Sequence, residues 1–263
     1  VKNVYFFSEL GYTEYPQEAA AQYGYTNLMF PNSFFDATIA HKLWQMYFDE
    51  MQYSVESGFD GLMINEHHNT PLSMSVSISV IGGILARLST TAKIVYLGNV
   101  LPIHDNPLRL AEEIALVDVI SGGRVISGFV RGIGYESLST TVNPAYNRER
   151  FEEAHDLIIK AWTIPGPFRW EGNHYQFRAV NPWVLPLQKP RPPIWIPGSN
   201  SPESIRYAAK RRYPYIIMAP RFDLLEEIYE LHRIAALGEG YETTPDHRGY
   251  AVRVFVSDND QLA

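Results

Sequence analysis

Short apolar, β-branched segments alternate with longer helical patterns along most of this chain of 263 residues. This alternation is typical of repeated βα units built around a parallel sheet. The predicted strands cover residues 4–7, 61–65, 93–101, 124–129, 194–196, 215–218 and 252–256. The predicted helices cover about 38–57, 73–88, 107–120, 147–162, 202–211 and 222–236. The order predicts an α/β fold of the TIM (β/α)8 barrel type, with an open sheet as the alternative.

The length allows one barrel domain or two smaller domains, and the strict order favours a single barrel over 1–263. A complete barrel needs about 50 further residues. We therefore expect the last βα unit to be absent, with 258–263 as the start of a seventh helix. Two aromatic-rich segments without a helix or strand pattern, about 9–36 and 165–193, are expected as insertions at the barrel rim. They either cover the rim or shape a substrate pocket.

Composition narrows the classes of function. The chain has 22 Lys+Arg and 29 Asp+Glu, and positive and negative residues are mixed along it rather than collected into blocks. This charge distribution argues against nucleic acid as the main partner. No apolar run reaches the roughly 18 residues of a membrane span, so we expect a cytoplasmic protein without a membrane partner. The absence of cysteine excludes disulfides, thiolate metal sites and a cysteine nucleophile.

The predicted strand 61–65 ends in Glu66, His67 and His68. Ligands bind at the carboxyl ends of parallel strands, so these groups predict a site. A metal hydrolase is an unfavoured alternative, because adjacent histidines of a strand point to opposite faces and no His-x-His or His-x-x-x-His pair adds ligands. His68 is expected to support the site residues or to pack against its neighbours rather than to take part in the reaction. His104 is expected to cap a turn.

Other predicted strand ends carry groups suited to an anion. Arg131 follows the fourth strand, and its neighbour Gly132 permits close approach of another group. The glycines of 128–134 do not fit the dinucleotide fingerprint, and no helix is expected to begin there. The segment 194–204 reads as strand, serine-rich turn and helix start, which suits a phosphate or an ordinary Ser201 N-cap. Together these ends predict a flat, phosphorylated cofactor at one barrel mouth.

The chain resembles the bacterial luciferase-like flavin monooxygenases, which are α/β barrels that use FMN or a deazaflavin. The resemblance runs over about residues 40–215 and is carried by Asn65-Glu66-His67-His68 and by segments 100–107, 118–124, 128–132 and 197–199. It implies that reduced flavin from a separate reductase reacts with oxygen in the barrel mouth. The C4a-hydroperoxide of the flavin then oxygenates a small apolar substrate.

The resemblance also implies roles for individual residues. His67 is expected to act as the catalytic acid or base near the reactive carbon of the flavin. Arg131 and Arg150 are expected at its phosphate, although Arg148 competes with Arg150 for that role. A non-proline cis peptide is expected at Leu97–Gly98. The residues expected to bind the cofactor are Glu66, Leu97, Gly98, Asn99, Arg131, Tyr135, Arg150, Gly198, Ser199, Asn200, Ser201 and Met218.

Three functions are consistent with these residues. The favoured one is a two-component FMNH2- and O2-dependent monooxygenase that works with a flavin reductase. The alternatives are a deazaflavin-dependent hydride-transfer oxidoreductase and a catalytically silent flavin-binding or partner-binding relative. A homodimer is expected from the resemblance. An apolar substrate pocket is expected from Tyr5, Phe7, Phe34, Phe35, Trp183 and Met218, and the identity of the substrate stays open.

Overall fold

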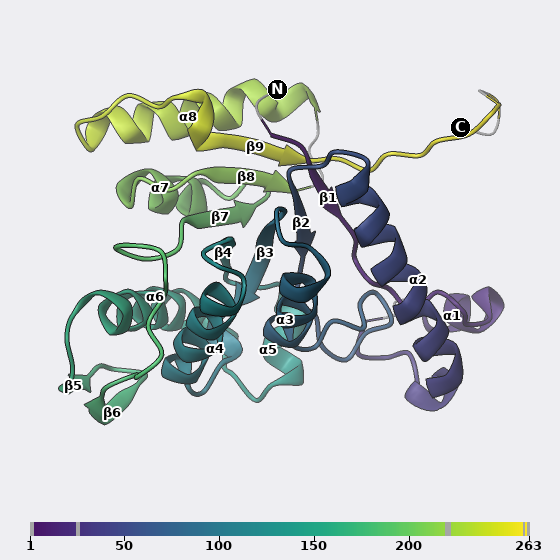
Figure 1. The fold of residues 1–263 in the computed structure, drawn as a ribbon, viewed down its shortest axis with the longest axis horizontal. Coiled ribbons are helices and arrows are strands. Elements are labelled where there is room, and N and C mark those ends of the chain that lie inside the picture. Colours follow the sequence, from purple (N-terminus) through teal and green to yellow (C-terminus); the bar gives the residue numbers. More distant parts are fainter. Residues whose placement is uncertain (1–2, 25–26, 219–221, 260, 262–263) are drawn as a thin grey trace. The chain divides into compact units, whose positions relative to one another are not determined.

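The computed structural model describes residues 3–24, 27–218, 222–259 and 261 (Figure 1). The chain divides into two compact units, Val1–Pro193 and Ile194–Ala263. The single barrel domain and the missing last βα unit therefore stay predictions. No helix within the described ranges is both long and apolar enough to cross a membrane.

The first unit is built on four parallel strands. They are β1 (Tyr5–Phe7), β2 (Gly61–Ile64), β3 (Lys93–Val100) and β4 (Val125–Val130), and each pairs with the next along the chain. β2 is wholly buried, and β3 and β4 are buried except at one end. Such apolar strands are typical of a parallel sheet that is covered on both faces. All four strands run the same way, so their carboxyl ends lie at one edge of the sheet.

Helices follow the strands and cover the sheet (Figure 1). The long helices of this unit are α2 (Ala37–Glu56), α3 (Ile78–Leu88), α4 (Pro107–Ile120) and α6 (Asn147–Thr163), and α4 packs beside both α3 and α6. The predicted signals for α4 are confirmed. Asn106 caps the helix by accepting the N–H of Arg109 at 3.0 Å, and Gly122 lies past its end at φ +69°.

The helix predicted over 73–88 begins only at Ile78. Its first residues are held in a loop by their own hydroxyl groups, because Ser73 Oγ accepts the N–H of Ser75 at 3.0 Å. Ser75 Oγ in turn donates to the carbonyl of Asn65 at 2.6 Å. Serine side chains that bond to nearby backbone groups compete with helix formation. The loop before α3 is thereby tied to the end of β2.

Both segments predicted to lack regular structure contain some. The first holds α1 (Gln17–Tyr23) and the 3-10 turn η1 (Asn32–Phe34), and the second holds the antiparallel pair β5 (Phe168–Glu171) and β6 (Gln176–Val180). Glu153 of α6 accepts hydrogen bonds from Trp170 Nε1 and from three backbone N–H groups of the turn between β5 and β6. A carboxylate distant in sequence therefore holds this hairpin. The rim position of both insertions stays a prediction.

A short helix, α5 (Gly134–Ser139), begins directly after the glycine-rich end of β4. The expectation that no helix begins there is wrong. Ile133 lies before the helix, and its N–H donates to the carboxylate of Glu136 at 2.7 Å. This contact closes the first turn of α5, and neither propensity nor hydrophobic periodicity reports it. The remaining 3-10 turns of the unit are η2 (Leu101–Ile103) and η3 (Pro144–Tyr146).

The second unit repeats the pattern on a smaller scale. Its strands β7 (Ile194–Gly198), β8 (Tyr215–Met218) and β9 (Arg248–Ala251) are parallel neighbours in that order. Two helices, α7 (Pro202–Lys210) and α8 (Leu225–Gly238), pack side by side. The 3-10 turns η4 (Phe222–Leu224) and η5 (Pro245–His247) precede α8 and β9.

The strand predicted over 252–256 is wrong, since β9 ends at Ala251 and Val254, Phe255 and Val256 are strongly exposed. Valines and phenylalanine favour strands by propensity, but the partners of the backbone decide the position. Tyr229 donates its hydroxyl to the carbonyl of Gly249 at 2.8 Å, and Gly249 lies against Ile216 of β8. The helix predicted over 258–263 lies partly outside the described residues, and the described ones form no helix.

Candidate active site

A partly buried imidazole lies between two carboxylates at the carboxyl edge of the first unit. His67 follows β2, Glu9 follows β1, and Glu136 belongs to α5, which follows β4. Nδ1 of His67 lies 2.9 Å from Oε1 of Glu136, and Nε2 lies 3.8 Å from Oε2 of Glu9. The side chain of His67 is 18% exposed and that of Glu136 is 1% exposed. The hydroxyl of Tyr135 lies 3.0 Å from Nδ1.

The backbone around His67 is held by the loop that precedes α3. Ser75 accepts the N–H of His67 with its carbonyl at 3.1 Å, and its hydroxyl bonds to the carbonyl of Asn65. The side-chain amide of Asn65 donates to the carboxylate of Glu9. The end of β2 is therefore joined by hydrogen bonds to the end of β1 and to the loop before α3.

Glu66 is a second centre of polar contacts and is 4% exposed. Its Oε1 lies 2.9 Å from Nε2 of His68, and its Oε2 lies 3.4 Å from Nε2 of His104 and accepts the N–H of Val100 at 3.2 Å. Burial alone would raise the pKa of Glu66, but the hydrogen bonds and charges of His104 and His68 outweigh it and lower the pKa to about 2. The bond to Glu66 raises the pKa of His68.

The two adjacent histidines thus face different carboxylates, His67 toward Glu136 and His68 toward Glu66. The contact of His68 with Glu66 agrees with the supporting role predicted for His68. His104 follows η2 and donates its backbone N–H to the carbonyl of Leu101 at 3.3 Å, as the predicted turn cap requires. Within the part of the chain that the structure describes, no group of three or more histidine, aspartate or glutamate side chains is arranged to hold a metal ion.

The predicted cofactor residues of β3 are placed at its carboxyl end. The peptide between Leu97 and Gly98 is trans, so the predicted non-proline cis bond is wrong. The pairing of β3 with β4 is instead irregular between Tyr96 and Asn99, and a Cβ on Gly98 would lie 3.0 Å from the carbonyl of Gly128. A local irregularity redirects a strand without the cost of about 3 kcal/mol for a cis peptide.

Asn99 is completely buried on β3, and neither polar atom of its side chain has a hydrogen-bond partner among the described residues. A buried amide without partners costs roughly 1–3 kcal/mol. The structure therefore contains a donor and an acceptor at the end of β3 that suit a polar ligand.

Arg131 directly follows β4, as predicted. Arg150 lies in α6, and its Nε donates to the carbonyl of Pro102 at 2.8 Å, while its guanidinium stacks on the ring of Tyr175 at 4.9 Å. A further contact of 3.4 Å joins it to Asp105. Arg150 therefore holds the loop after β3, and the phosphate role of both arginines stays a prediction.

In the second unit, the predicted order of strand, turn and helix is confirmed. Gly198 ends β7, and α7 begins at Pro202 after Ser201 in the N-cap position. The side chain of Ser201 makes no cap bond, and its hydroxyl donates to Glu203 at 3.0 Å. Met218 ends β8. Anion binding by Gly198, Ser199, Asn200 and Ser201 stays a prediction, as does the contact of Met218 with the cofactor.

The aromatic residues of the segment between β1 and α2 form pairs with each other. Phe34 stacks on Phe30 at 4.9 Å between ring centroids, and Phe35 lies 5.2 Å from Tyr12. Trp183 was predicted to line an apolar pocket, but its side chain is 91% exposed and lines no enclosed one. Tyr5 and Phe7 are partly buried in β1.

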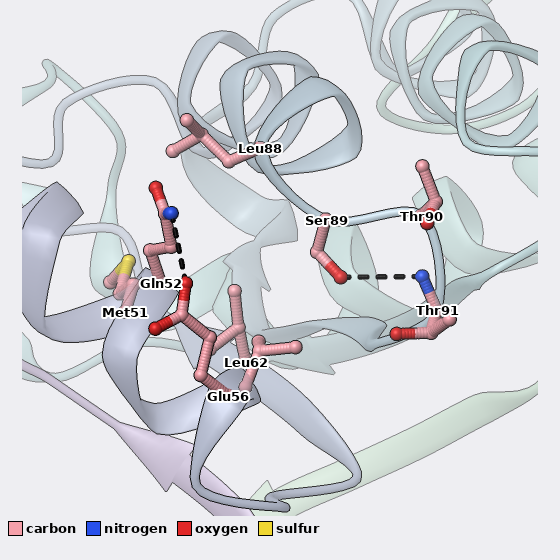
Figure 2. A pocket seen from close by; sticks show the side chains of 9 residues that line it. Met51, Gln52, Glu56, Leu62, Leu88, Ser89, Thr90 and Thr91 are labelled. Atoms are coloured by element: carbon pink, nitrogen blue, oxygen red, sulfur yellow. Dashed lines mark hydrogen bonds between the residues drawn. The ribbon is translucent and has the colours of Figure 1, made fainter.

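A cavity of about 180 Å³ lies at the other end of the strands (Figure 2). It is lined by Met51, Gln52, Val55, Glu56, Leu62, Leu88, Ser89, Thr90 and Thr91, which come from α2, the end of α3 and the amino-terminal sides of β2 and β3. Pockets for cofactors usually have about 300–1,000 Å³. The cavity is smaller and does not include His67, so it is not the candidate active site.

Two residues of the site, Glu9 and Glu136, were not predicted from the sequence. Glu9 follows a predicted strand end, so the rule that identified His67 would also have selected it. Glu136 carried no signal of its own, because its side chain reaches His67 only through the short helix α5, which was not predicted.

Known proteins resemble the chain along most of its length. The oxygenase component of the flavin-dependent trigonelline monooxygenase of Acinetobacter baylyi is 30% identical over 63% of this chain and 47% of its own length. The FMN complex of the oxygenating constituent of 3,6-diketocamphane monooxygenase from Pseudomonas putida is 21% identical, with a TM-score of 0.76 over 85% of this chain and 65% of that one.

An F420-dependent secondary alcohol dehydrogenase, solved with an F420-acetone adduct, is 16% identical, with a TM-score of 0.68 over 79% of this chain and 64% of that chain. These similarities confirm the predicted fold class, α/β of the TIM-barrel type. The chain spans about half the length of the curated relatives it matches.

The sequence profile described as luciferase-like monooxygenase matches residues 52–263. This range includes His67, Glu66, Asn99 and Glu136 and covers most of the chain. The chain therefore belongs to the luciferase-like monooxygenase family.

Proposed function

We propose that this chain is the oxygenase component of a two-component monooxygenase that uses FMNH2 and O2 to oxygenate a small apolar organic substrate. The observation that carries the proposal is the imidazole of His67, held between Glu136 and Glu9 at the carboxyl edge of the sheet. Membership of the family and the flavin-dependent relative support it.

The residues at this edge fit a flavin. The isoalloxazine ring presents both hydrogen-bond donors and acceptors, and the buried amide of Asn99 offers one of each that no described residue engages. A flavin at this position would supply the electrons with which O2 is activated. His67 then takes up or releases a proton beside it, because an imidazole changes its charge near neutral pH. Glu66 fixes the ends of β2 and β3 beside His67.

The anionic end of the cofactor calls for donors and positive charge. We assign Arg131, which follows β4, to the flavin phosphate, and Arg150 as a second candidate. Residues 198–201 present hydroxyl and backbone N–H donors before α7. Because such donors bind anions, we assign these residues to an anionic group. Leu97 and Gly98 keep their assignment to the flavin ring, and Tyr135 keeps its assignment to the cofactor.

The proposal is tested by mixing the chain anaerobically with FMNH2 and then with oxygen while the flavin absorbance is recorded. We expect the time course of flavin reoxidation in the wild-type chain to differ from that of free flavin. The time course in His67→Ala should be closer to that of free flavin. His41 is exposed on α2, so His41→Ala serves as a matched control without effect. A time course identical to that of free FMNH2 in the wild-type chain would contradict the proposal.

A deazaflavin-dependent hydride transfer is the second candidate, favoured by the likeness to the F420-dependent dehydrogenase. FMN and deazaflavin share the ring system and the ribityl phosphate, so the phosphate residues do not separate them. Equilibrium titration with FMN and with a deazaflavin decides between the two functions. Tight binding of the deazaflavin with weak binding of FMN would favour hydride transfer.

The remaining partners follow from the two-component scheme. A flavin reductase would deliver FMNH2, as the oxygenase component in Acinetobacter baylyi suggests.

A homodimer through α3 is supported by an apolar stripe on its surface, where Val80, Ile84 and Leu88 are 64%, 38% and 40% exposed. Light scattering checks this: we expect twice the monomer mass for the wild type and the monomer mass for Val80→Asp.

A further inference from the structure

We infer that Glu136 is a positioning residue that keeps a proton on Nδ1 of His67 and leaves Nε2 as the nitrogen available for proton transfer. The use of Nε2 in a reaction rests on the proposed function. The position of the proton on the neutral imidazole is a property of this chain alone.

The contact between the two groups requires a proton on the ring. Oε1 of Glu136 lies 2.9 Å from Nδ1 of His67, and a carboxylate offers only lone pairs to such a contact. The other oxygen, Oε2, already accepts the N–H of Ile133 at 2.7 Å. Both oxygens therefore act as acceptors, and the hydrogen between Glu136 and His67 belongs to Nδ1.

Tyr135 does not change this assignment, although its hydroxyl lies 3.0 Å from the same nitrogen. If the hydroxyl donated to a bare Nδ1, the lone pair of Nδ1 would face that of Glu136 Oε1 at 2.9 Å. With the proton on Nδ1, the N–H makes a bifurcated hydrogen bond, in which the phenol oxygen of Tyr135 is the weaker acceptor. The carboxylate is the stronger acceptor because it is charged and 1% exposed.

Among the described residues, none makes a hydrogen bond of normal length with the other nitrogen of His67, Nε2. Nε2 lies 3.8 Å from Oε2 of Glu9, beyond hydrogen-bonding distance. In the described part of the chain, the charged and titratable groups that these contacts place near the ring are Glu9 after β1, Glu136 and Tyr135 of α5, and His68, whose charge interacts with that of Glu136. Nε2 is therefore the nitrogen that exchanges a proton with a ligand.

The backbone holds Glu136 in this position. Gly132 has φ +77°, and a Cβ at this residue would lie 2.4 Å from Oε2 of Glu136 and 2.6 Å from Val100. Only glycine lets the loop after β4 close on the carboxylate without strain. The hydroxyls of Ser139 and Thr140 donate to the carbonyl of Glu136 at 2.8 and 2.7 Å.

The test is nitrogen NMR of the flavin-free chain labelled with ¹⁵N at the histidine rings, recorded in alkaline buffer. Protonated and bare ring nitrogens of a neutral imidazole have widely separated shifts, and loss of signals in His67→Ala assigns them. We expect the wild type to carry the proton on Nδ1.

Glu136→Gln is expected to move the proton to Nε2. The backbone N–H of Ile133 can only donate, so it retains the amide oxygen of the new side chain, and the amide NH2 then faces Nδ1. A bare Nδ1 accepts from that group. Glu112 lies exposed on α4, so Glu112→Gln is the matched control and leaves the pattern unchanged.

A wild-type spectrum with the proton on Nε2 overturns the inference without any variant. An unchanged pattern in Glu136→Gln also overturns it. Anaerobic titration of the same samples with FMNH2 separates this result from the proposed function: a chain with the expected Nδ1 proton that binds no FMNH2 contradicts only the function. A chain that binds FMNH2 with the proton on Nε2 contradicts only the inference.

Discussion

Glu66→Gln is expected to destabilise the fold by about 2 kcal/mol near neutral pH. The carboxylate contacts His68, His104 and the N–H of Val100, and its pKa falls from the ordinary 4.5 to about 2. Each pKa unit corresponds to about 1.4 kcal/mol, which gives an upper value of about 3 kcal/mol. The side chains of His68 and His104 are 27% and 26% exposed, so water weakens the interaction and reduces the expected loss.

The pH dependence of this loss has a definite sign. The pKa of Glu66 is lower in the folded than in the unfolded chain, so its contribution is present above about pH 4.5 and disappears toward about pH 2. The pKa of His68 is raised in the folded chain, so its part is present below about pH 6.5 and is lost as the pH rises through the folded value. The difference between wild type and Glu66→Gln is therefore largest at about pH 5–6.5.

Urea unfolding across this pH range measures the difference. We expect the midpoint for Glu66→Gln to shift with an unchanged slope, since the same surface is exposed on unfolding. Glu112→Gln, on the exposed face of α4, should leave the midpoint in place. A loss below about 0.5 kcal/mol at pH ~6, or a loss independent of pH, would refute the assigned role of the buried carboxylate.

Three further perturbations have expected outcomes. Gly132→Ala should cost about 1–3 kcal/mol in thermal unfolding, because of its positive φ and the contact with Glu136, whereas Gly134→Ala meets no neighbouring atom and should cost little. Glu153→Gln should loosen the hairpin of β5 and β6 and speed its cleavage in limited proteolysis, since one charged side chain accepts four hydrogen bonds there. Burial lowers the pKa of His232 to about 4, so only the unfolded chain gains this proton between about pH 6.5 and 4. The free energy of unfolding should therefore fall by about 3 kcal/mol over that range, and His232→Leu should remove this part of the fall.

Sequence reasoning located elements best where short-range chemistry decides them. Asn106, Pro107 and the glycines after residue 121 set both ends of α4 at the predicted positions. The same reasoning failed where distant groups decide. β9 lies before the valine-rich segment that propensity selected, because its backbone bonds to Tyr229 and pairs with β8. The hairpin of β5 and β6 depends on Glu153, which lies in a helix that precedes it.

The candidate site shows the same division. The abrupt end of β2 in Glu66 and His67 was visible in the sequence, because a buried strand that ends in ionisable groups is unusual. Of the supporting groups, Glu9 follows a predicted strand end as His67 does, but Glu136 was not visible. Acidic residues in first helical turns are common on protein surfaces, so the position of Glu136 does not separate it from an ordinary solvated side chain.

Burial and contact distance supply the missing distinction. A glutamate that is 1% exposed and lies 2.9 Å from an imidazole cannot be a solvated surface group, since burying a carboxylate is costly without a partner. Its cost is offset by two donors, the ring of His67 and the N–H of Ile133, and the glycine at residue 132 allows both contacts at once. The closed first turn of α5 and the catalytic hypothesis for His67 thus depend on one side chain, that of Glu136. A substitution of Glu136 that keeps the bond to Ile133 is therefore expected to change the proton position on the imidazole of His67 while the fold is retained.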